Sequence, residues 1–293
     1  MKVLVLGGEG MLGHKMWQVL SQHFETYATM RQPVSAYSHY GIFDPEKTIG
    51  GIDCLNFDST VKVIGKLKPD VIVNCIGIVK QVIEKYDKID VLTINSIFPH
   101  RLKNLCFLNS TRLIHISTDC IFTGQKGMYR EEDESDATDL YGKSKYLGEV
   151  DCDNCLTLRT SIIGRELGTK NGLLEWFLSN NGGTVKGYSN VIFSGFPTIV
   201  LADIIAKVIR DFPNLNGILH VSTDQISKFD LLQLIADEYK LRTKVKPSDD
   251  YSIDRSLDSS RFRNKTGIIP PEWPELIEKM KKDPTPYNNW RTK

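Results

Sequence analysis

The sequence predicts an α/β fold in which a doubly wound parallel sheet carries helices on both faces. Short apolar segments alternate with helical segments along the first half of the chain, which is typical of βαβ units. A glycine-rich loop follows the first apolar segment and opens the first helix. With 293 residues, the chain is long enough for one large domain or two unequal ones.

Strand and helix patterns follow one another up to about residue 163. Each expected strand is a short apolar run, and each expected helix is a longer stretch with apolar residues at helical spacing. The run VIVNC, for example, comes after Pro69-Asp70, which ends the preceding helix. We expect strands at residues 2–6, 26–30, 71–75, 112–117 and 155–159, and helices at residues 11–23, 61–67, 91–108 and 141–150.

The pattern changes after residue 163, where glycines cluster and the segments become shorter. Helices are expected at residues 199–212 and 228–239, the second with Ser227 as its N-cap, and a strand at residues 218–221. No repeat or low-complexity linker separates the two regions. The sequence therefore predicts a first domain over residues 1–163 and a smaller C-terminal α/β portion for substrate binding over residues 164–282. The second portion is expected to pack closely on the first and to be able to exchange segments with it. Residues 283–293 are expected to form a tail.

The composition excludes several classes of protein. Lys and Arg together number 37 and Asp and Glu 36, so the net charge of +1 lacks the basic excess of nucleic-acid binders. No run of 18 apolar residues predicts a membrane helix, and the N-terminus lacks the features of a secretory signal. We therefore expect a cytoplasmic enzyme or binding protein that binds neither nucleic acid nor membrane.

The six cysteines and six histidines do not predict a metal site. Only Cys152 and Cys155 form a C-x-x-C pair, and no second pair completes a zinc site. A redox pair is expected to open a helix after a strand, whereas this pair precedes a predicted strand. We therefore expect all six cysteines to be reduced thiols with packing roles, and no bound metal.

The glycine-rich loop predicts a nucleotide site in a Rossmann-like domain. Residues 7–13 (GGEGMLG) contain G-x-x-G-x-x-G, with Gly7, Gly10 and Gly13 between a strand and a helix. The first glycine of such a loop permits a tight turn, the second admits a pyrophosphate to the helix N-terminus, and the third lets helix and strand pack closely. The alternative is a glycine-rich turn without a ligand.

The residue that follows the second predicted strand bears on the choice of cofactor. An acidic residue there favours NAD, whereas an arginine accommodates the 2′-phosphate of NADP. This strand ends at Met30-Arg31, and no Asp or Glu follows until Asp44. We therefore expect NADP(H) in preference to NAD(H). The alternative is that Arg31 is a solvated surface residue.

A tyrosine and a lysine stand four residues apart on a predicted helix. Tyr141 and Lys145 in YGKSK therefore share one helix face. A neighbouring ammonium is expected to lower the pKa of the phenol, which suits the pair for acid–base chemistry on a carbonyl or an alcohol. Thr118 and Asp119 follow the strand at residues 112–117, at the edge where a parallel sheet binds ligands. The same residues also suit an ordinary helix face and a turn.

Together these motifs resemble the extended short-chain dehydrogenase/reductase superfamily, and within it the dTDP-4-dehydrorhamnose reductase family, whose members act on nucleotide-linked sugars. The resemblance covers roughly residues 1–282. Besides residues 7–13 and YGKSK, the matching segments are PDVIVN (69–74), STD (117–119) with Phe122 and Gly124, Gly148-Glu149, LRTS (158–161), GFPT (195–198), HVS (220–222) and Leu257-Asp258 with Ser260.

The resemblance implies an NADP(H)-dependent reductase of a keto group on a nucleoside-diphospho-deoxysugar. Tyr141 would be the acid, Lys145 would lower its pKa and hold the nicotinamide ribose, and Thr118 would orient the carbonyl. Thr118 and Asp119 would also contact the sugar. Contacts to the cofactor would come from Tyr141 and Lys145 and from Gly7, Gly10, Met11, Leu12, Gly13, Arg31, Asn56, Phe57, Cys75, Ile76 and Gly77.

The chain departs from the family at three places. Cys120 stands where the reductases usually have a tyrosine, Cys75-Ile76-Gly77 stands where they carry small alanines, and residues 80–88 differ from an acidic stretch. These departures bear on the identity of the sugar and not on hydride transfer.

Two alternatives stay open. One is a sugar-nucleotide epimerase, in which the cofactor is oxidised and reduced again within one turnover. The other is a non-catalytic subunit that binds the dinucleotide, like the regulatory subunit of methionine adenosyltransferase. A homodimer would be usual for this fold. We expect the acidic segment 131–139 to be a solvated loop or a lid rather than a metal site.

Overall fold

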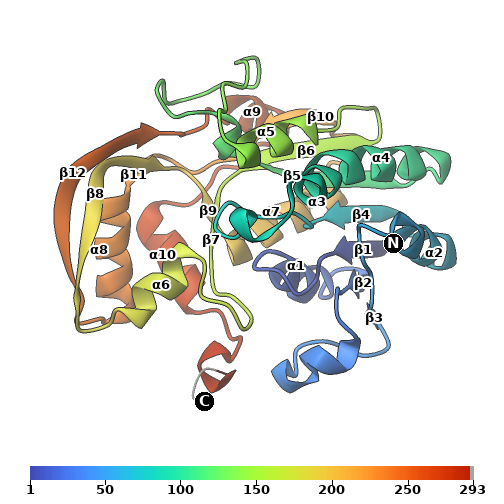
Figure 1. Cartoon of the computed structure of the whole chain (residues 1–293), viewed down its shortest axis with the longest axis horizontal. Helices are drawn as coiled ribbons and strands as arrows, with labels where there is room; N and C mark the ends of the chain where they lie inside the picture. The colour runs from blue at the N-terminus through green and yellow to red at the C-terminus, as the bar shows by residue number, and fades with distance from the viewer. Residues whose placement is uncertain (291–293) are drawn as a thin grey trace.

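A computed structural model describes residues 1–290 and builds them around one central sheet (Figure 1). All seven strands of this sheet are parallel, and their order is β10-β6-β5-β4-β1-β2-β3. This arrangement confirms the fold class predicted from the sequence. The strands are β1 (Lys2–Leu6), β2 (Glu25–Thr29), β3 (Thr48–Ile49), β4 (Val71–Asn74), β5 (Arg112–Thr118), β6 (Cys155–Thr160) and β10 (Gly217–His220).

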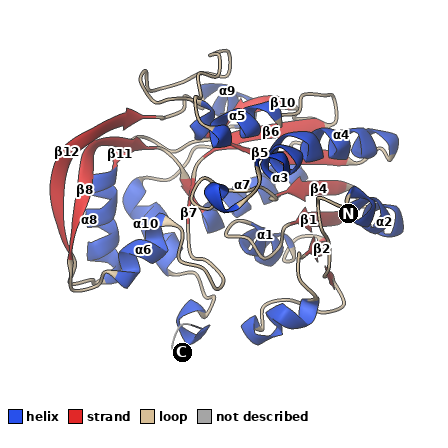
Figure 2. Cartoon of the chain, viewed as in Figure 1, coloured by secondary structure: helices blue, strands red, loops and turns tan. Residues whose placement is uncertain are grey.

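Helices cover both faces of the central sheet (Figure 2) because side chains along each strand alternate between two apolar clusters. Val3 and Val5 of β1 pack with α1 and α7, whereas Leu4 and Leu6 pack with α2 and α4. The helices are α1 (Gly13–Leu20), α2 (Phe57–Leu67), α3 (Lys88–Leu92), α4 (Phe98–Leu108), α5 (Leu140–Leu147), α6 (Leu173–Ser179), α7 (Thr198–Asp211), α8 (Lys228–Tyr239), α9 (Ser260–Thr266) and α10 (Trp273–Lys281).

The helical stretch expected at residues 91–108 contains a π-helical turn, Thr93–Ile97, between α3 and α4. Asn95 lies in this turn. Its Oδ1 accepts a hydrogen bond from the backbone nitrogen of Ile78 at 2.8 Å, and its Nδ2 donates to the Ser144 hydroxyl at 3.1 Å. The turn therefore connects the loop after β4 to α5.

The second half of the chain forms a smaller layer and also returns to the central sheet. In the smaller layer, at the left of Figure 1, β8 (Thr184–Phe193) pairs in parallel with β12 (Lys244–Asp254) and antiparallel with β11 (Ile226–Ser227). Between the layers, β7 (Ile162–Ile163) pairs with β9 (Phe196–Pro197). Because β10 joins β6 at the edge of the central sheet, part of the second half of the chain belongs to that sheet.

Residues 283–290, which the sequence analysis places in a tail, pack against α1. The Lys15 ammonium is 2% exposed, lies 2.6 Å from the Asp283 carboxylate and donates to the Thr285 hydroxyl. The His14 Nε2 lies 2.6 Å from the Tyr287 hydroxyl. Residues 291–293 of the expected tail lie outside the described residues.

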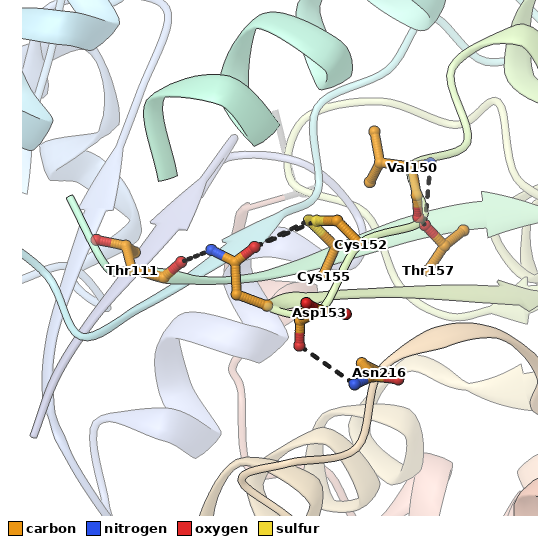
Figure 3. Close-up of a disulfide and its surroundings, with 8 residues drawn as sticks. Thr111, Val150, Cys152, Asp153, Cys155, Thr157 and Asn216 are labelled. Atoms are coloured by element: carbon orange, nitrogen blue, oxygen red, sulfur yellow. Dashed lines mark hydrogen bonds between the residues drawn. A yellow bond between two sulfur atoms is a disulfide. The ribbon is translucent and has the colours of Figure 1, made fainter. Parts of the chain in front are cut away.

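Cys152 and Cys155 form a disulfide, so the expectation of six reduced thiols is wrong for this pair (Figure 3). A turn before β6 brings their Cα atoms to 5.0 Å, within the range that a disulfide needs. The Asn154 side chain holds this turn by donating a hydrogen bond to the Thr111 carbonyl oxygen at 2.7 Å. A C-x-x-C pair can form a disulfide in a tight turn as well as at the start of a helix, and the prediction took only the helix into account. The free cysteines are Cys54, Cys75, Cys106 and Cys120.

Candidate active site

The glycine loop turns sharply between β1 and α1. Gly7 has a φ of +79°, a conformation that favours glycine, and the Gly10 nitrogen donates to the Gly7 carbonyl oxygen at 3.1 Å. A Cβ on Gly13 would overlap with that same carbonyl oxygen, so the close approach of α1 to the loop requires glycine. Because α1 begins at Gly13, the loop lies at the N-terminus of this helix, where the helix dipole favours an anion.

A cavity of about 210 Å³ lies beside the glycine loop, where the carboxyl ends of β1, β2 and β4 meet. The loop and this cavity together fit a dinucleotide, as ligands of open parallel sheets bind at this edge. The predicted cofactor residues among its lining are Gly7, Gly10, Arg31, Cys75, Ile76 and Gly77.

Arg31 is the cationic member of this lining. Its backbone nitrogen donates to the Glu9 carboxylate at 2.9 Å, and its guanidinium lies 3.4 Å from the Tyr86 hydroxyl. Both Glu9 and Tyr86 also line the cavity, so the exposed Arg31 side chain lies at its wall.

Seven predicted cofactor residues lie outside the lining of the cavity: Met11, Leu12, Gly13, Asn56, Phe57, Tyr141 and Lys145. Met11, Leu12 and Gly13 form the passage from the loop into α1. Asn56 caps α2, and Phe57 packs into the core with its ring centroid 5.8 Å from that of Phe98. The lining instead includes Asp53 and Cys54, which sequence reasoning missed because the loop before α2 has no periodic pattern.

The hydroxyl groups of Thr118 and Tyr141 meet at the carboxyl end of β5. Thr118 is the last residue of β5, and Tyr141 lies in the first turn of α5, which Asp139 caps by accepting a hydrogen bond from the Gly142 nitrogen at 2.8 Å. The Thr118 side chain lies close enough to Tyr141 for hydrogen bonding to lower the pKa of the phenol. The Thr118 Oγ1 also lies 3.2 Å from Oδ1 of Asp119. The three polar side chains predicted at this edge are thus together.

Tyr141 and Lys145 share a helix face, but the expected lowering of the Tyr141 pKa is not found. Burial raises the pKa of Tyr141 well above its usual value, a negative charge on Cys120 would raise it further, and the hydrogen bond from Thr118 lowers it by less. The Lys145 ammonium donates a hydrogen bond to the Ile116 carbonyl oxygen at 2.8 Å.

The Lys145 ammonium faces the cofactor cavity. The side chain is only 5% exposed, and a Cβ on Gly77 would lie 3.8 Å from its Nζ. Burial lowers the pKa of Lys145 to about 8, whereas the charge of Glu149 acts in the opposite direction. Lys145 therefore lies between the Tyr141 helix and the residues that line the cavity.

A buried ion pair supports this edge of the sheet. Arg159 of β6 donates to both carboxylate oxygens of Glu149, from Nε at 2.9 Å and from Nη2 at 2.8 Å. The Ser117 hydroxyl donates to the same carboxylate at 2.7 Å. Glu149 thus joins β5, β6 and the chain just after α5. Apart from the family resemblance, nothing in the sequence predicted that Arg159 and Ser117 would bind Glu149.

The acidic segment 131–139 is bonded to the rest of the chain. Glu131 accepts a hydrogen bond from the His220 nitrogen at 2.9 Å, and Asp139 forms an ion pair with Lys80 at 2.6 Å. Among residues 1–290, no group of three or more His, Cys, Asp or Glu side chains is arranged to hold a metal ion. Within the same residues, none of the helices has the length and apolar character needed to cross a bilayer.

The sequence matches the RmlD substrate binding domain family over residues 1–285. The chain belongs to this family. This match confirms the resemblance stated from the sequence motifs. The spore coat polysaccharide biosynthesis protein SpsK of Bacillus subtilis is 29% identical, over 94% of this chain and 95% of the relative. A dTDP-4-dehydrorhamnose reductase of Aggregatibacter actinomycetemcomitans is 24% identical, over 78% of this chain and 86% of the relative. Methionine adenosyltransferase 2 subunit beta of Danio rerio is 30% identical over 44% of each chain.

Solved structures share the fold of this RmlD-family chain. A hypothetical dTDP-4-dehydrorhamnose reductase from Sulfolobus tokodaii has a TM-score of 0.78 and 27% identity, covering 93% of this chain and 98% of its own. The dTDP-4-dehydrorhamnose reductase of Bacillus anthracis, solved in complex with NADP, also has a TM-score of 0.78. It is 21% identical and covers 96% of this chain and 98% of its own.

Substitution of Gly13 in this RmlD-family chain tests the glycine loop. Because a Cβ at this position overlaps with the Gly7 carbonyl oxygen, Gly13→Ala is expected to lower the free energy of unfolding by about 1–3 kcal/mol and to weaken NADPH binding. Urea unfolding and fluorescence titration with NADPH measure the two effects. The control is Gly65→Ala in α2, where no atom lies within 4 Å of the new Cβ and stability should rise by up to about 1 kcal/mol. Wild-type stability and affinity in Gly13→Ala would contradict this account.

Proposed function

We propose that the chain is an NADP(H)-dependent reductase of a keto group on a nucleoside-diphospho-deoxysugar. The observation that carries the proposal is that Thr118, at the end of β5, lies close to Tyr141, while the Lys145 ammonium on the Tyr141 helix lies near Gly77 in the lining of the cofactor cavity. The relatives and solved structures that are named as dTDP-4-dehydrorhamnose reductases support the substrate class.

In this proposal Tyr141 is the general acid. A tyrosine phenol is protonated at neutral pH, so it can give a proton to the carbonyl oxygen as that oxygen gains charge. Thr118 donates a second hydrogen bond to the same oxygen and fixes its direction. Lys145 holds the nicotinamide ribose from the wall of the cavity. When bound, NADPH supplies the hydride for the carbonyl carbon.

Loss of the Tyr141 hydroxyl tests the acid. NADPH oxidation is followed at 340 nm with a panel of nucleotide-linked 4-keto-6-deoxysugars. Tyr141→Phe should turn over at least one sugar of the panel about 10²–10⁴-fold more slowly than wild type, with unchanged NADPH affinity, because only proton transfer is removed. The matched control is Tyr146→Phe on the same helix, whose side chain is exposed.

Two results would contradict the proposal. Near-wild-type turnover by Tyr141→Phe would remove Tyr141 from the mechanism. Tight NADPH binding by wild type without oxidation by any sugar of the panel would contradict the reductase itself, and would favour the epimerase or the regulatory subunit.

We also propose that the cavity prefers NADP(H) to NAD(H), with Arg31 at the 2′-phosphate. Arg31→Ala should weaken NADPH about 10- to 100-fold and NADH much less, because a hydrogen bond between charged groups contributes about 1.5–3 kcal/mol. Binding titrations of both dinucleotides measure this difference. The control is Arg210→Ala, which removes an exposed arginine paired with Asp211. Equal losses for the two dinucleotides would refute the role of Arg31.

A further inference from the structure

Residues 283–290, at the end of the described chain, are held on α1 next to the glycine loop. The buried Lys15 ammonium of α1 lies 2.6 Å from the Asp283 carboxylate and donates a hydrogen bond to the Thr285 hydroxyl at 2.6 Å. The Thr285 backbone nitrogen donates in turn to Asp283 at 3.1 Å. These contacts join segments that are about 270 residues apart in the sequence, and they determine where Tyr287 meets α1.

The Tyr287 side chain is fixed at its ring and at its hydroxyl. Tyr287 is 3% exposed, with the Arg165 guanidinium 4.8 Å from the centroid of its ring and the Trp290 ring packed edge-on at 5.7 Å. Its hydroxyl lies 2.6 Å from Nε2 of His14, which has no exposed surface, and 3.2 Å from the Asp283 carboxylate. The phenol therefore points into the interior, at the first turn of α1.

The hydrogen bonds of His14 have a definite direction. Its Nδ1 lies 2.8 Å from the Gly10 carbonyl oxygen, which can only accept, so Nδ1 carries the proton. Burial lowers the pKa of His14 to about 3, so the ring is neutral and Nε2 is an acceptor. The one phenolic proton of Tyr287 is donated to Nε2, the nearer of its two neighbours. A chain of hydrogen bonds thus runs from Tyr287 through His14 to the Gly10 carbonyl oxygen.

This carbonyl oxygen determines the direction of an N–H group in the glycine loop. It accepts a second hydrogen bond from the backbone nitrogen of His14 at 3.1 Å, so two donors of one residue hold it. The C=O and N–H of a trans peptide point in opposite directions. The Met11 N–H, in the same peptide as the Gly10 carbonyl, is therefore turned away from His14. Within residues 1–290, no oxygen accepts a hydrogen bond from it.

A fixed N–H at this place suits a phosphate group. Gly10 lines the cofactor cavity, and the loop lies at the N-terminus of α1, where anions bind. A phosphate oxygen accepts hydrogen bonds, and a donor that already points in the right direction loses little conformational freedom when the phosphate binds.

We propose that Tyr287 is a positioning residue for the cofactor, which acts through His14 to direct the Met11 N–H toward the pyrophosphate. This inference rests on the proposed function, because it takes the glycine loop to bind a dinucleotide. Tyr287 itself lies outside the lining of the cofactor cavity. The terminal segment would therefore support cofactor binding without contacting the cofactor.

Binding titrations of the full chain with three ligands test the inference. NADPH and 2′-phospho-ADP-ribose contain the pyrophosphate, whereas adenosine 2′-monophosphate lacks it. If NADH binds more tightly than NADPH, then NADH, ADP-ribose and adenosine take their places. Tyr287→Phe removes the hydroxyl and keeps the ring beside Arg165 and Trp290. The control is Tyr239→Phe, which removes a buried hydroxyl without a hydrogen-bond partner among residues 1–290 and should leave all three affinities unchanged.

Tyr287→Phe should weaken the two ligands that contain the pyrophosphate about 3- to 10-fold, the effect of losing one hydrogen bond between neutral groups. The affinity for the third ligand should not change. In a His14→Leu background, which already lacks the hydrogen-bond chain, Tyr287→Phe should have no further effect. If Tyr287→Phe does not fold, His14→Leu alone should show the same selective loss, because the phenol can then donate to Asp283 instead.

Three results would overturn the inference. An equal loss for the ligand without a pyrophosphate would indicate general damage to the fold. Additive losses in the double variant would show that Tyr287 does not act through His14. Unchanged affinity for all three ligands would show that the terminal segment does not position the loop, while the proposed function would stand. If wild type binds no dinucleotide, the inference and the proposed function both fail.

Discussion

The buried ion pair between Glu149 and Arg159 is the contact on which the geometry of the site depends. Both side chains are less than 5% exposed, and the Glu149 carboxylate also accepts a hydrogen bond from Ser117. This one carboxylate therefore joins the end of β5, which carries Thr118, to the chain just after α5, the helix that contains Tyr141 and Lys145. Removal of either partner would leave an uncompensated charge in the interior, which proteins tolerate poorly. The position of the reacting hydroxyls thus follows from interactions behind them, away from the ligand.

Burial also decides the charge state of the site. It raises the pKa of the Tyr141 phenol and lowers that of the Lys145 ammonium, so each is shifted toward its neutral form. The Lys145 ammonium donates a hydrogen bond to the Ile116 carbonyl oxygen, which fixes its position behind Tyr141 on the same helix.

Local patterns in the sequence predicted the elements that carry the site. Strand β1 has the predicted bounds, Ser227 caps α8, and Thr118, Asp119 and Tyr141 meet as parallel-sheet topology requires. Features that depend on distant or irregular segments were not predictable in this way. Lys15 and Asp283 are 268 residues apart, Asp53 lies in a loop without periodicity, and the Cys152–Cys155 disulfide depends on the geometry of one turn.

Transfer of deuterium tests the central claim, net reduction of a sugar carbonyl, most directly. NADPH that carries deuterium at both C4 positions of the nicotinamide is incubated with the protein and a nucleotide-linked 4-keto-6-deoxysugar, and the product is analysed by mass spectrometry and NMR. A reductase would give one deuterium on the former carbonyl carbon for each NADPH consumed. A product that forms without consumption of NADPH, or that carries no deuterium at that carbon, would contradict the account.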